Sequence, residues 1–126
     1  MPSFRTKGGY ILRFYKKINM EISTDKEINI QMFFKISENN IQIIDIREKY
    51  EYELGNIPNS IHIPMDKILK SIEKIEKNKK VIIYCRSGRR SAAVKYMLEI
   101  EHKTQNIYCL EGGYEAFLDY LKNKKK

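Results

Sequence analysis

The chain has 126 residues, 42% of them apolar, and two cysteines, a composition that fits one globular domain and excludes disordered, fibrous and disulfide-stapled chains. Its formal net charge is +8, yet five of the 24 bases lie in residues 1–20 and four in residues 122–126, where there are no acids. Removing these nine leaves 15 bases against 16 acids in residues 21–121, so the domain itself is close to neutral and we expect no specific nucleic-acid partner.

We divide the chain into a basic N-terminal extension (residues 1–25), a domain (residues 26–121) and a basic C-terminal tail (residues 122–126). The apolar run at residues 10–15 is broken by Arg13 and is too short to span a bilayer, so no membrane span is expected. Neither cysteine stands in a Cys-x-x-Cys or Cys/His zinc spacing, so we expect no metal and no cofactor. No secretory signal follows the apolar run, which predicts a reducing, cytoplasmic setting for the free thiols.

From residue 26 onward, short apolar runs rich in β-branched residues alternate with segments of helical periodicity. The predicted strands are a short one at Glu27–Ile28, followed by residues 41–46, 60–63, 81–84 and Ile107–Leu110. Apolar residues recur at helical spacing in residues 30–36, 68–75, 93–98 and 114–121. Asn29 and Asp66 are the expected N-caps of the first two helices, because their side-chain oxygens can accept from otherwise unpaired N–H groups.

This alternation predicts an α/β fold. A strand, a helix and a second strand in the same sheet imply a crossover connection, which makes the two strands parallel. A nearly continuous apolar strand such as residues 81–84 is typical of a strand that is covered on both sides. The sequence therefore predicts a mostly parallel sheet flanked by helices on both faces.

Residues 81–91 contain the most informative motif of the chain. A buried strand leads to Cys85, a short loop follows, and a helix begins, which places Cys85 where open parallel sheets bind ligands. The N–H groups of such a loop and helix start form an anion nest, and Gly88 lets the backbone curl tightly. We expect a sulfur atom at the centre of this nest to be a thiolate and therefore an activated nucleophile.

A plainer interpretation treats Cys85 as a small buried hydrophobic residue and the nearby arginines as a solvated helix start. Cations at a helix N-terminus oppose the helix dipole, so three arginines within six residues lower the stability of the helix. This cost favours the functional interpretation.

Four motifs in the same order make residues 28–118 resemble the rhodanese-like domain family. The loop from Cys85 to Ser91 looks like the family's active-site signature of a cysteine, four residues and an arginine. The other three motifs are residues 44–58, residues 61–64 and the glycine pair of residues 110–113. Asn56 departs from the family pattern by replacing the usual histidine, and Phe117 stands where the family often has tryptophan.

The resemblance implies a five-stranded parallel sheet flanked by helices on both faces. It also implies a sulfurtransferase, which takes sulfur from thiosulfate or another sulfane-sulfur donor as a persulfide on Cys85 and passes it to cyanide, a thiol or a protein thiol. Related arsenate reductases and cell-cycle phosphatases have one more residue in this loop, so the shorter spacing between Cys85 and Arg90 favours sulfur over phosphate. A non-catalytic sulfur carrier or interaction module of the same fold is the alternative.

The expected anion cradle consists of the backbone N–H groups of Arg86, Ser87, Gly88, Arg89 and Arg90. As side chains, Arg86 and Arg89 would attract the sulfonate of thiosulfate or a charged acceptor protein.

Supporting roles are expected for three residues outside the loop. Arg90 closes the loop and is expected to pair with a carboxylate, for which Asp45 and Glu51 are both candidates. Arg47, which follows the same strand as Asp45, is expected to support the site in a similar way.

The remaining titratable candidates have plainer explanations. His62 and His102 lack the spacing of a catalytic base, and an anion nest can generate a thiolate without one. Cys109 lies on a predicted buried strand and is expected to belong to the core, with a resolving thiol as the open alternative. Gly112 and Gly113 are expected to form a turn with positive φ before the last helix.

Overall fold

The computed structural model describes residues 26–36 and 38–124. The proposed N-terminal extension, residues 1–25, and the last two lysines of the proposed tail lie outside these residues. The final helix runs to Lys124, so residues 122–124 continue it. Within the described part of the chain, no helix is long and apolar enough to cross a membrane.

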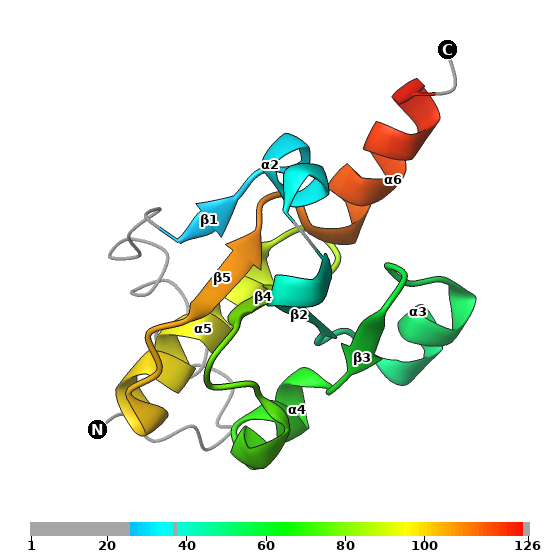
Figure 1. Cartoon of the computed structure of the whole chain (residues 1–126). Coiled ribbons are helices and arrows are strands. Elements are labelled where there is room, and N and C mark those ends of the chain that lie inside the picture. Colours follow the sequence, from blue (N-terminus) through cyan, green and yellow to red (C-terminus); the bar gives the residue numbers. More distant parts are fainter. Residues whose placement is uncertain (1–25, 37, 125–126) are drawn as a thin grey trace.

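The centre of the molecule is a sheet of five parallel strands in the order β1-β5-β4-β2-β3 (Figure 1). The strands are β1 (Glu27–Ile28), β2 (Ile41–Asp45), β3 (Ser60–His62), β4 (Lys80–Tyr84) and β5 (Ile107–Leu110). The predicted fold class is therefore confirmed, and the strand bounds agree within one residue. Because all strands are parallel, their carboxyl ends share one edge, and β4 holds the central position there.

Side chains that alternate along β4 divide the interior into two cores. Val81 and Ile83 point into a core that they share with residues of α4 (Met65–Ile68) and α5 (Arg89–His102). Ile82 and Tyr84 point to the other face, which α2 (Ile30–Lys35) and α6 (Gly113–Lys124) cover (Figure 1). The expected cover on both faces is therefore present.

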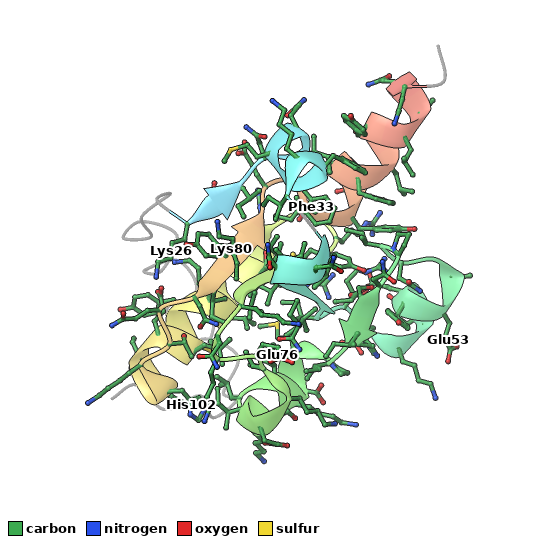
Figure 2. The ribbon with its side chains drawn as sticks, viewed as in Figure 1. Lys26, Phe33, Glu53, Glu76, Lys80 and His102 are labelled. Carbon is green, nitrogen blue, oxygen red and sulfur yellow. The ribbon has the colours of Figure 1, made fainter. Side chains whose placement is uncertain are left out.

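The first helix begins as its sequence predicts. Asn29 is the N-cap of α2, and its side chain accepts from the amide of Met32 at 2.8 Å. Phe33 points from α2 toward the sheet (Figure 2) and is buried, whereas Phe34 is partly exposed and stacks on Tyr120 of α6. A short 3-10 turn, η1 (Glu38–Asn40), then leads into β2.

Helix α3 (Lys49–Leu54) is an element that apolar periodicity did not reveal. None of its residues is buried, so it has no apolar face to mark it in the sequence. A capping box stabilises its start instead: Glu48 caps the first turn, and the carboxylate of Glu51 accepts from the amide of Glu48 at 3.1 Å.

The prediction of one helix over residues 68–75 with Asp66 as its N-cap is wrong. Pro64 is the N-cap of α4, and its carbonyl accepts from the amides of Lys67 and Ile68. Asp66 therefore lies inside the first turn. The chain leaves the helix after Ile68 and forms a separate 3-10 turn, η2 (Ile72–Lys74), although Ile68 and Ile75 are both buried as expected.

Candidate active site

Cys85 follows β4 directly and lies at the carboxyl edge of the sheet, as the sequence predicts. The residue is only 1% exposed, and it belongs to the core beneath α5. The exposed residues Arg86 and Ser87 and the half-buried Gly88 form a three-residue loop, and α5 begins at Arg89. The loop therefore wraps the sulfur at the start of a 14-residue helix.

Two backbone amides donate to the sulfur of Cys85. The N–H of Gly88 is 3.0 Å from Sγ, and the N–H of Ser91 is 3.4 Å away. Gly88 belongs to the predicted cradle, whereas Ser91 was outside it. Ser91 follows the arginine of the motif, and the helical backbone turns its amide back toward the sulfur. Amides at a helix start stabilise negative charge on such an atom.

Two glycines shape the cysteine loop for different reasons: Gly88 lies in the loop, and Gly113 lies at the start of α6. Gly88 is the N-cap of α5 with φ +103°, a conformation that side chains with a Cβ rarely adopt. Gly113, with φ +60°, packs against the backbone of the loop: a Cβ there would come within 2.8 Å of the Arg86 carbonyl. The predicted positive φ of Gly112 and Gly113 is therefore confirmed.

The start of α6 supports the loop through its own N–H groups. The amide of Tyr114 donates to the carbonyl of Cys85 at 2.8 Å, and the amide of Glu115 donates to that of Arg86 at 3.1 Å. The sequence motif placed a glycine turn before the last helix but did not indicate that this helix binds the loop. The contact joins residues almost thirty positions apart in the sequence, so no local sequence pattern predicts it.

Arg90 pairs with Glu51, one of the two carboxylates that the sequence left open. The guanidinium lies 3.4 Å from Oε1, and the two side chains are 30% and 13% exposed. This ion pair joins α3 to the first turn of α5, directly after the cysteine loop. Arg86 and Arg89 are exposed and make no ion pair within residues 26–36 and 38–124, so both charges face the solvent beside the loop.

Asp45 pairs with Arg47 instead of Arg90. The two charged groups are 2.6 Å apart and almost fully buried, and Arg47 also donates to the carbonyl of Gly55 at 2.6 Å. Burial lowers the pKa of Arg47, but the hydrogen bond and charge of Asp45 outweigh it and raise that pKa overall. The guanidinium lies 4.2 Å from the ring centre of Tyr114. Arg47 thereby connects the buried Asp45 to Tyr114 of α6, whose amide donates to the carbonyl of Cys85.

Cys109 is a core residue of β5, as the sequence predicts. It is 2% exposed, and burial raises its pKa to about 12 against the opposing effects of Lys95 and Ser91. It therefore remains a neutral thiol at physiological pH. Both cysteines are free.

The two histidines lie in structural hydrogen bonds. Nε2 of His62 is 2.7 Å from the carbonyl of Arg47, and its ring stacks on Tyr52. Nε2 of His102 is 3.0 Å from the carbonyl of Leu69. In the described part of the chain, no group of three or more His, Cys, Asp or Glu side chains could hold a metal ion.

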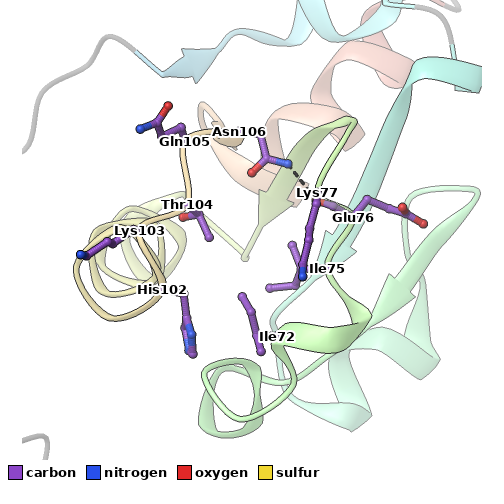
Figure 3. Close-up of a pocket in the computed structure, with 9 residues that line it drawn as sticks. All are labelled: Ile72, Ile75, Glu76, Lys77, His102, Lys103, Thr104, Gln105 and Asn106. Carbon is purple, nitrogen blue, oxygen red and sulfur yellow. Dashed lines mark hydrogen bonds between the residues drawn. The ribbon is translucent and has the colours of Figure 1, made fainter.

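A cavity of about 360 Å³ lies away from Cys85, where α5 ends and the chain approaches β5 (Figure 3). Ile72, Ile75 and His102 line it together with the segment from Lys103 to Asn106. Asn106 closes one side by donating to the carbonyls of Glu76 and Lys79. These residues come from the opposite end of β5, so the cavity is not part of the cysteine site.

Known proteins resemble this chain in sequence and in fold. The model of the rhodanese-like domain family matches residues 35–120. The putative sulfurtransferase YtwF of Bacillus subtilis is 38% identical over 89 residues, which cover 70% of this chain and 84% of that protein. The thiosulfate sulfurtransferase GlpE of Coxiella burnetii is 34% identical over 82 residues, covering 65% and 76%.

Two further matches extend the comparison. The putative sulfur carrier protein YrkF of B. subtilis is 34% identical over 90 residues, covering 66% of this chain and 49% of that protein. The crystal structure of a rhodanese-related protein from Thermoplasma volcanium superimposes with a TM-score of 0.68 at 29% identity, covering 75% of this chain and 92% of that one. A thiosulfate sulfurtransferase, a putative sulfurtransferase and a putative sulfur carrier thus occur among proteins similar to this chain.

Proposed function

The chain belongs to the rhodanese-like domain family, and on this premise we propose that it is a sulfurtransferase with Cys85 as its nucleophile. It takes a sulfane sulfur from thiosulfate or a persulfide donor and passes it to a thiophilic acceptor. The acceptor is cyanide, a small thiol or a protein thiol. The two free cysteines suit a reducing compartment, and we place this activity in the cytoplasm.

The proposed reaction has two displacement steps. The thiolate of Cys85 attacks the outer sulfur of thiosulfate, a new S–S bond forms, and sulfite leaves with the electron pair of the bond that breaks. The product is a persulfide anion on Cys85. An acceptor such as cyanide then attacks the outer sulfur, thiocyanate leaves, and the electron pair returns to Cys85 as a thiolate.

One observation carries the proposal: the amides of Gly88 and Ser91 donate to the sulfur of Cys85 at the start of α5. Such donors stabilise an anionic sulfur without rearrangement during the reaction. Arg86 and Arg89 supply exposed positive charge beside the loop, which favours the approach of an anionic donor.

The intact mass of the protein after thiosulfate treatment tests this proposal. We expect one added sulfur atom, which cyanide or a thiol reductant removes. Cys85→Ser should abolish the addition, and the matched variant Cys109→Ser should keep most of it, because Cys109 stays a buried neutral thiol. Addition that depends on Cys109 instead of Cys85 would contradict the assignment of the nucleophile.

The alternative is a sulfur carrier or interaction module of the same fold, which the similarity to YrkF supports. Steady-state turnover of thiosulfate with cyanide separates the two. An enzyme releases thiocyanate over many cycles, whereas a carrier loads sulfur once and keeps it until its own partner arrives. A second assay, the hydrolysis of an aryl phosphate, tests for a phosphatase. The short loop between Cys85 and Arg90 disfavours that activity.

A further inference from the structure

Ser91 is a fully buried residue of the first turn of α5 whose side chain the proposed function leaves without a task. Its hydroxyl donates to the carbonyl of Gly88 at 3.0 Å. The thiol of Cys85 donates to the same hydroxyl oxygen, with 3.7 Å between Sγ and Oγ. The hydroxyl therefore contacts both the sulfur and the backbone of the loop.

The charge of the sulfur decides how these groups can pair. A thiol donates its own hydrogen to Oγ, which leaves the hydroxyl hydrogen free for the Gly88 carbonyl. A sulfur anion has no hydrogen and can only accept. Because a hydroxyl hydrogen rotates to suit its partners, it can turn from the carbonyl to the sulfur without moving the backbone. Hydrogen bonds to a charged acceptor are stronger than those to a neutral carbonyl.

We propose that Ser91 is a further catalytic residue, whose hydroxyl donates to Gly88 while Cys85 is a thiol and to Cys85 when that sulfur is an anion. This inference rests on the proposed sulfurtransferase function. The hydroxyl is a third donor to the sulfur, beside the two amides. Ser91 keeps its hydrogen in both positions, so it neither gains nor loses a proton during the cycle.

Cys109 leaves the Ser91 hydrogen available for this task. It lies in the same core cluster as Cys85 and within hydrogen-bonding reach of Ser91. Because burial holds its pKa at about 12, Cys109 keeps its proton at neutral pH. A neutral thiol is a weak acceptor and competes poorly with an anion for the hydroxyl hydrogen.

A serine in the first turn of a helix can also be purely structural, since it often bonds to a backbone group of its own turn. Ser60 provides a matched control for that role. It is buried, and its hydroxyl donates to the carbonyl of Ile57 at 2.6 Å, three residues earlier, as that of Ser91 does to Gly88. The second partner of Ser60 is the hydroxyl of Tyr84 rather than a sulfur.

The test is the rate of iodoacetamide alkylation at Cys85 as a function of pH, with the modified residue located by peptide mass. In Ser91→Ala we expect the midpoint to rise by about one pH unit, because the anion loses one hydrogen-bond donor. Ser60→Ala should lose a similar amount of thermal stability without moving the midpoint. Ser91→Thr, which returns a hydroxyl, should restore at least half of the shift.

An unchanged midpoint in folded Ser91→Ala, or an equal shift in Ser60→Ala, would overturn the role of Ser91. If Ser91→Thr does not fold, the comparison of the two alanine variants decides alone. Alkylation reports on the sulfur of Cys85 whether or not the protein transfers sulfur. Failure of the wild-type protein to take up sulfur would therefore contradict the proposed function and leave the result on Ser91 intact.

Discussion

At the scale of single residues, the site depends on atoms that approach one another more closely than most side chains allow. Gly113 lies against the carbonyls of Cys85 and Arg86, and Gly88 holds a positive φ beside Gly112. Both positions exclude a Cβ for steric or conformational reasons. The shape of the loop therefore depends partly on the absence of a Cβ at these two glycines.

Gly113→Ala should lower the free energy of unfolding by about 2–4 kcal/mol, because it combines a backbone overlap with a residue at φ +60°. It should also reduce sulfur uptake at Cys85, since the added methyl group displaces the loop. Gly112→Ala is the matched control: its φ is +77°, but its Cβ would meet the side chain of Ala116 instead of the loop. Urea unfolding should show similar losses of stability in the two variants. The rate of sulfur uptake should fall further in Gly113→Ala than in Gly112→Ala.

The raised pKa of Cys109 predicts a pH dependence of stability. A thiol whose pKa rises from 9.0 to about 12 on folding ionises first in the unfolded chain. Its contribution to stability is therefore complete below pH 9 and is lost as the pH rises toward 12, by about 1.4 kcal/mol per pH unit.

The measurement compares Cys85→Ser with the double variant Cys85→Ser/Cys109→Ala, so that only Cys109 titrates. Unfolding by urea at pH 7, 9 and 10.5 should show the difference between the two proteins shrinking above pH 9. A difference that stays constant over this range would mean that Cys109 ionises equally easily in the folded and unfolded chains.

At the scale of secondary-structure elements, the exposed helix α3 contacts the start of α5 through one side chain. It buries no residue, yet Glu51 both caps its first turn and pairs with Arg90 at the end of the loop. A short helix on the surface thus restrains the start of α5, which carries the donors to Cys85.

Glu51→Gln should lower stability by only about 0.5–1 kcal/mol, because the pair with Arg90 is partly exposed and the amide oxygen can still accept from Glu48. We expect a larger effect on the sulfurtransferase rate, a fall of several-fold, since Arg90 loses its restraint. Glu53→Gln, which removes the exposed pair with Lys49, is the control and should change neither quantity measurably. Thermal melting and thiocyanate release measure the two effects, and equal rates in both variants would assign Glu51 to capping alone.

At the scale of the whole molecule, the carboxyl edge of the sheet gathers every part of the site. Cys85 follows the central strand β4, and α6 contacts the loop from the side of β5. The C-terminal end of α6 points away from this edge (Figure 1). Its last turn is exposed and carries two bases, Lys122 and Lys124.

Deletion of residues 122–126 should therefore leave sulfur transfer to cyanide within a few-fold of the full-length rate. The truncation removes two residues beyond the described part of the chain and the exposed end of α6. Within the described part, residues 122–124 make no hydrogen bond to the cysteine loop. Turnover by the truncated protein, with circular dichroism to show that it is folded, provides the measurement. A large loss of turnover by a folded protein would show that the tail takes part in the reaction.

The sequence by itself determined the features that depend on local patterns. Apolar, β-branched runs marked all five strands within one residue, and the spacing of Cys85, Gly88 and Arg90 located the loop. Asn29 marked the start of α2 correctly, because an N-cap acts on an amide three residues away. Asp66 failed as a cap because Pro64, two residues earlier, already supplied the carbonyl on which the helix begins.

Only the tertiary structure decided the contacts between distant segments. Asp45 and Glu51 were both candidates for the partner of Arg90. The choice followed from the position of α3, which brings Glu51 to Arg90, and from the ion pair between Arg47 and Asp45. The packing of Gly113 on the loop likewise depends on β5 lying beside β4. Strand order is set by the balance of many packing contacts over the whole chain, so no short segment of sequence contains it.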